Sequence, residues 1–150
     1  MPRLARLYIR TAFLYFVFGF TLGGAMLVDK WLGPHVLFVA LRQVHVHFLL
    51  VGWMVQFIIG VAYWMFPRFT RERPRGSEPL SWATYAMLNA GLLLRGVAEP
   101  LLTVGRGGWP GPALGLSALL QVIAGFLFVA NTWSRVRSLT GDSAPRSSRE

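Results

Sequence analysis

Four long apolar runs dominate this 150-residue chain and decide what it can fold into. We expect one helix in each run, over residues 4–29, 35–66, 79–104 and 112–137. About 20 apolar residues in a helix cross the roughly 30 Å of hydrocarbon in a bilayer, and each run reaches that length. The pattern predicts an all-α polytopic membrane protein with four transmembrane helices in an up-down bundle, because short loops join antiparallel neighbours.

The composition agrees with a membrane domain. Hydrophobic residues make up 54% of the chain and charged residues 14%, against about 25% charged residues in a typical soluble domain. The absence of cysteine excludes a disulfide scaffold, a cysteine-ligated zinc or iron–sulfur site, a thiol nucleophile and a c-type heme. We expect residues 1–138 to form the transmembrane domain and the polar stretch 139–150 to be a disordered cytoplasmic tail.

The positive charge marks the orientation of the helices rather than a nucleic-acid surface. Most of the basic residues lie in three stretches, at 3–10, 68–75 and 135–149, and the two other loops carry few. Because lysine and arginine stay on the cytoplasmic side, both termini and the second loop are predicted to lie inside. The expected partner is therefore the lipid bilayer, in which the chain is expected to be a multi-pass protein, and not nucleic acid. The expected location is a bacterial cytoplasmic (inner) membrane.

Two histidines in the second run, His45 and His47, are the strongest candidates for chemistry. Polar residues inside membrane helices are costly, so they point to function, and histidine ligates heme iron, copper and zinc. Residues two apart on a helix point about 200° apart, so these two rings cannot hold one metal together. His35 lies about 15 Å further along the helix axis from His45.

A second axial ligand therefore has three sources that the sequence leaves open. A methionine (Met26, Met54 or Met87) is the first. An open sixth position is the second, and a histidine from another subunit is the third. We take His45 as the ligand that faces the bundle, with His47 facing a neighbouring helix, a partner subunit or lipid.

Three further residues complete the predicted cofactor site. Gly52 lies on the His45 face, where glycine lets a flat macrocycle or another helix approach the backbone. Arg42 and Arg95 lie at a depth where they suit heme propionates, which arginine pairs in bidentate fashion. The alternative for Arg95 is an ion pair with Glu99, four residues further along the helix.

These residues carry a resemblance to a known family. The segment ALRQVH at 40–45, followed by Gly52, Tyr63 and Pro67–Arg68, resembles the second transmembrane helix of catalytic subunit I of the heme–copper oxidases. The nitric oxide reductase-like branch and its short four-helix relatives are the most similar. The segments NAGLLLR at 89–95 and AEP at 98–100 resemble the third helix of those relatives.

The resemblance implies that His45 is an axial ligand of a low-spin heme b. The other heme and copper ligands of the family come from later helices that these 150 residues do not contain, so copper is the weaker expectation. The chain is expected not to be a complete oxidase or reductase on its own. The implied function is electron transfer to or from a quinol or a periplasmic carrier, as a homodimer or as a subunit of a larger membrane complex.

Two other functions fit the same residues. A heme-based sensor of nitric oxide or redox state requires an open sixth position. A non-catalytic subunit, or an assembly factor that delivers heme or copper to a respiratory complex, requires only transient binding.

Overall fold

The computed structural model describes residues 1–66, 76–105 and 107–137, and its regular structure in these ranges is entirely helical. The elements are α1 (Arg3–Leu32), α2 (Val36–His47), η1 (Phe48–Val55), α3 (Gln56–Met65), α4 (Glu78–Thr103) and α5 (Pro110–Arg137). The all-α prediction is confirmed for the described ranges. The predicted tail at 139–150, and Pro67 and Arg68 of the resemblance, lie outside them.

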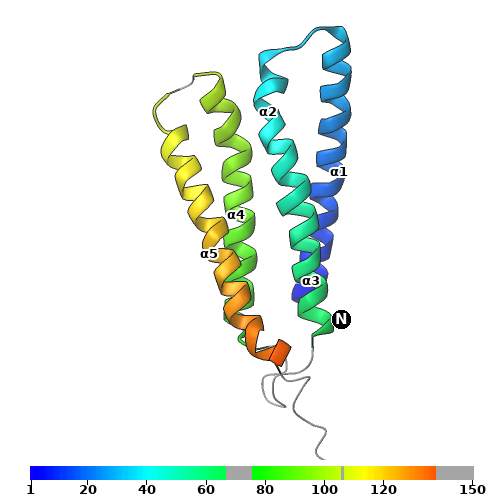
Figure 1. Ribbon diagram of the computed structural model, residues 1–150, viewed down its shortest axis with the longest axis vertical. Coiled ribbons are helices and arrows are strands. Elements are labelled where there is room, and N and C mark those ends of the chain that lie inside the picture. Colours follow the sequence, from blue (N-terminus) through cyan, green and yellow to red (C-terminus); the bar gives the residue numbers. More distant parts are fainter. Residues whose placement is uncertain (67–75, 106, 138–150) are drawn as a thin grey trace, which may run out of the picture.

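The helices form two antiparallel pairs, as Figure 1 shows. One pair consists of α1 and the continuous rod α2–η1–α3, and the other of α4 and α5. Gly33 closes the turn of the first pair: its N–H donates to the carbonyl of Asp29 over 3.0 Å, and its φ of 121° suits glycine. Helix α4 packs along α5 on one side and against α2 on the other.

The second rod departs from regular α geometry. Its centre, η1, is a π-helix over Phe48–Val55, between His47 and Gln56. π-Helical turns are rare and are frequent at functional sites. Positions on the two sides of η1 therefore do not follow the simple 3.6-residue period that the sequence analysis assumes.

Three helices are long and apolar enough to cross a membrane: Arg3–Leu32, Val36–Met65 and Pro110–Trp133. Among the described residues, α4 does not reach the same apolarity, so the count of four transmembrane helices stays a prediction. Large apolar side chains cover the exterior, such as Trp31, which is 84% exposed, and Phe126, which is 73% exposed. A surface of this kind is typical of contact with lipid.

Small residues let the first two rods approach closely. A Cβ added to Gly60 would lie 2.8 Å from the Cβ of Tyr8, and one added to Gly19 would lie 2.6 Å from Leu49. Both distances are shorter than the contacts that Cβ atoms make in proteins. At Gly60 the neighbouring atom is the Cβ of Tyr8, next to the α1 backbone, so a side chain there would push the rods apart; at Gly19 the neighbour is the end of the flexible Leu49 side chain. Gly19 of α1 and Gly60 of α3 therefore serve helix packing, as small residues commonly do in membrane bundles.

Polar contacts join α1 to α4 in the half of the bundle that holds the N-terminus. The Tyr8 hydroxyl donates to the carbonyl of Ser81 over 3.2 Å, and the hydroxyls of Thr11 and Tyr85 share a hydrogen bond of 2.8 Å. The rings of Tyr8 and Tyr85 meet edge to face with centroids 5.0 Å apart. These contacts hold the two helix pairs together.

Arg135 attaches α5 to the end of α3, and we expect Arg135→Met to destabilise the fold by about 2 kcal/mol. Its buried guanidinium donates to the carbonyl of Phe66 over 2.8 Å and lies 5.7 Å from the centre of the Phe66 ring. Unfolding in detergent measures the loss. The exposed Arg10 is the control, since Arg10→Met removes the same charge. Equal stability of the two variants would contradict this role.

Candidate functional site

His45 lies on α2 with its ring turned toward α1. Its Nδ1 lies 3.0 Å from the carbonyl oxygen of Gly19. A carbonyl oxygen only accepts, so Nδ1 carries the proton and donates it. The Nε2 atom then keeps its lone pair, which is the form that binds a metal, and no partner for Nε2 is found in the described ranges.

Gly23 makes room for this ring. A Cβ on Gly23 would lie 2.7 Å from Cε1 of His45, closer than real Cβ atoms come to other atoms. The imidazole is half-buried, and its hydrogen bond and its packing both come from α1. The orientation of the ring is thus set from outside its own helix, as is common for metal-ligating histidines.

Gly52, where the sequence predicts that a macrocycle could approach the backbone, is buried against α1. A Cβ there would lie 2.6 Å from Cγ of Tyr15 and 3.0 Å from its Cβ. The structure thus places an aromatic ring of α1 over Gly52, which lies between His45 and Gly60, and all three residues contact α1. The contact between Gly52 and Tyr15 is helix packing, which was the alternative role expected for this glycine.

His47 and His35 are directed elsewhere. The Nδ1 of His47 lies 3.1 Å from the carbonyl of Gln43, on its own helix. His35, in the turn between α1 and α2, pairs through Nδ1 with the carboxylate of Asp29, which also accepts from the His35 backbone N–H over 3.1 Å. In the part of the chain that the structure describes, no three histidine, aspartate or glutamate side chains gather as a metal site.

The two predicted propionate partners occupy different surroundings. Arg42 is exposed on α2. Arg95 pairs with Glu99 over 3.2 Å, which is the alternative considered for it, and both side chains are largely buried. The neighbouring Gly96 packs against Phe48, so Arg95 lies level with the histidines. Helix α4, which carries Arg95, contacts the second rod through Val44 and Phe48. His45 instead faces α1.

The chain matches the family model described as cytochrome c and quinol oxidase polypeptide I over residues 3–145. The chain belongs to this family. It is therefore a membrane protein similar to subunit I of the heme–copper oxidases. No curated protein and no solved structure matches it.

Subunit I proteins of this oxidase family generally bind heme and copper, and the residues present fit part of that chemistry. The imidazole of His45 offers one lone pair, held in a fixed orientation by Gly19 and Gly23. That donor suits one axial position of a heme iron. A copper centre needs several convergent ligands, and the described residues bring no such group together.

Gln56 is a polar residue within the second apolar run. Its side chain is fully buried, and both amide atoms lack a hydrogen-bond partner among the described residues. The sequence also gives no motif for a polar cluster at the end of the bundle that holds the N-terminus, where Asn131 of α5 bonds to Ser77, the residue that precedes α4, and to Ser81 of α4. The signal available was the four-residue spacing of these serines, which puts them on one helix face.

Proposed function

We propose that this member of the subunit I family binds one b-type heme through Nε2 of His45 and transfers electrons. The single observation that supports this is the hydrogen bond from His45 Nδ1 to the Gly19 carbonyl. It fixes the tautomer that leaves Nε2 free, and it holds the ring in place before a ligand arrives. A bound heme supplies reversible one-electron chemistry at its iron.

The second axial ligand in this proposal is the same histidine of a second copy. His35 and His47 each bond through Nδ1 to a group near them in sequence and point away from His45. A two-fold dimer contributes the same surface twice. One histidine per chain then suffices for a six-coordinate heme. Within the family, the nitric oxide reductase-like branch remains the proposed relative.

The position of His45 favours exchange of electrons near the outer surface. Nine residues separate it from Val36, the start of α2, which is about 13 Å of helix. Arg42 lies one turn nearer the outer end and is free to pair with heme propionates. A quinol in the outer leaflet or a periplasmic carrier is the proposed redox partner.

The proposed topology places both termini inside a bacterial cytoplasmic membrane, with α4 as the fourth span. The chain has no cysteine, so single-cysteine variants report orientation directly. We expect Gly108→Cys, at an open and exposed position of the outer turn, to react in intact cells with a membrane-impermeant maleimide. Pro2→Cys should react only after the membrane is permeabilised, and the reverse pattern would contradict the topology.

Absorption spectra of the detergent-purified protein test the heme proposal. We expect sharp bands of a six-coordinate b heme after reduction with dithionite, unchanged by carbon monoxide. A spectrum shifted by carbon monoxide would indicate an open site and favour the gas- or redox-sensor function. Absence of heme after expression with added heme would favour a non-catalytic subunit or an assembly factor.

A further inference from the structure

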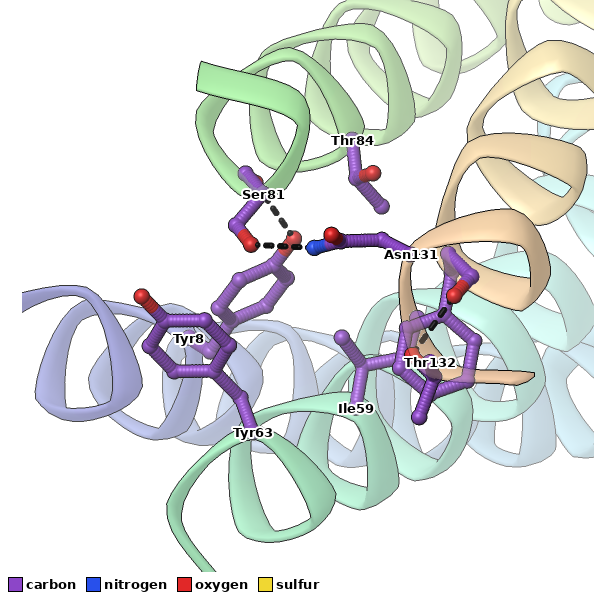
Figure 2. A pocket seen from close by; sticks show the side chains of 8 residues that line it. Tyr8, Ile59, Tyr63, Ser81, Thr84, Asn131 and Thr132 are labelled. Carbon is purple, nitrogen blue, oxygen red and sulfur yellow. Dashed lines mark hydrogen bonds between the residues drawn. The ribbon is translucent and has the colours of Figure 1, made fainter. Parts of the chain in front are cut away.

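A small cavity lies between the helices at the inner end of the bundle, away from the His45 site (Figure 2). Its walls come from α1, α3, α4 and α5, so both helix pairs contribute. The space open to the centre of a water-sized sphere is about 10 Å³. That is close to the room that one water molecule needs.

Three hydroxyl groups that line the cavity donate their protons to backbone carbonyls. Tyr8 donates to the carbonyl of Ser81 over 3.2 Å, Thr84 to that of Leu80 over 2.8 Å, and Thr132 to that of Phe128 over 2.6 Å. A hydroxyl has one proton and two lone pairs. The oxygens of Tyr8, Thr84 and Thr132 therefore have only lone pairs left to offer.

Both side-chain amide atoms of Asn131 also have hydrogen-bond partners. Its Nδ2 donates to Ser81 Oγ over 2.9 Å and to the carbonyl of Ser77 over 3.2 Å, and its Oδ1 accepts from the Ser77 N–H over 2.9 Å. Figure 2 shows this amide meeting Ser81 next to the Tyr8 hydroxyl. These groups give the cavity hydrogen-bond acceptors without a spare donor.

We propose that this cavity binds one water molecule, which donates its protons to the oxygens of Tyr8, Thr84 or Thr132. A water held in a protein interior needs two to four polar partners, and these three side chains supply them. Among the described residues, those that line the cavity include no carboxylate, so none of them would compensate the charge of a cation in a medium of low dielectric. The water links α1, α4 and α5, and this site is independent of heme.

Water contact is measured directly by nuclear Overhauser effects between water and methyl groups. In deuterated protein with labelled methyls, we expect a cross-peak from water to the Ile59 δ1 methyl, which lines the cavity. The δ methyls of Leu92, which is fully buried outside the cavity, are the control and should show none. Absence of the Ile59 peak, or equal peaks at both residues, would overturn the proposal.

Threonine-to-valine variants separate the water site from an ordinary helix hydroxyl. Thr84, Thr132 and Thr103 each donate to the carbonyl four residues earlier, but Thr103 is exposed and far from the cavity. We expect Thr84→Val and Thr132→Val each to lower Tm by about 3 °C, and the double variant to lose the Ile59 peak. Thr103→Val should leave Tm unchanged.

Equal shifts in all three single variants would assign the effect to the helix hydroxyls and overturn the proposal. A last measurement tests for a bound cation: Tm is compared in sodium chloride, ammonium chloride and choline chloride. A rise in Tm with sodium or ammonium that Thr84→Val abolishes would identify a cation in place of water.

Discussion

Replacement of His45 by alanine is expected to remove the heme absorption bands of the purified protein. The imidazole held by Gly19 is the proposed axial ligand, and neither other histidine substitutes for it. His47 bonds to the carbonyl of Gln43 on its own helix, and His35 pairs with Asp29 in the turn between α1 and α2. The heme content per chain, measured as the pyridine hemochrome, should fall to background.

Two controls make this result specific to the ligand. His47→Ala removes a ring of the same kind from the same helix and should keep the heme content. Added imidazole, which fits the space left in His45→Ala, should restore part of the spectrum if the variant is folded. A normal heme spectrum in His45→Ala would refute the assignment of this residue.

Gly52→Val should destabilise the bundle by about 3 kcal/mol or prevent its folding. The new Cβ would lie 2.6 Å from Cγ and 3.0 Å from Cβ of Tyr15, atoms close to the α1 backbone that cannot swing aside. The side chain of Tyr15 is buried and packs edge to face on Phe48, with centroids 5.0 Å apart. Relief of the clash therefore requires α1 to move away from η1.

Gly125→Val is the matched control, because nothing lies within 4 Å of a Cβ at Gly125. Thermal unfolding in detergent, followed by circular dichroism, compares the two variants. We expect a large decrease in Tm for Gly52→Val and little change for Gly125→Val. Similar Tm values would mean that the Tyr15–Gly52 contact does not hold the first two rods together.

The helices themselves could be predicted from the sequence, because their signal is local. The apolar runs at 4–29 and 112–137 indicated helices that are observed at Arg3–Leu32 and Pro110–Arg137. Their composition alone shows that three helices, Arg3–Leu32, Val36–Met65 and Pro110–Trp133, are apolar enough to cross a membrane. Polar residues in such runs are few, so His45 and the Arg95–Glu99 pair could also be singled out by residue type and spacing.

The neighbours of these residues were decided by tertiary packing. Helical period predicts that His45 and Gly52 share a face, but it does not say that the face meets α1, where Gly19 and Tyr15 lie. Nor does it predict the π-helix of η1, whose hydrogen bonds depend on how this rod packs.

The inner cavity depends even more on the assembled bundle. Tyr8, Thr84 and Thr132 are far apart in the chain and belong to no sequence motif, and three different helices bring them together. Local patterns encode which residues share a helix face, because that depends on the backbone repeat. The group that each face contacts depends on the shapes and hydrogen bonds of helices far away in the chain.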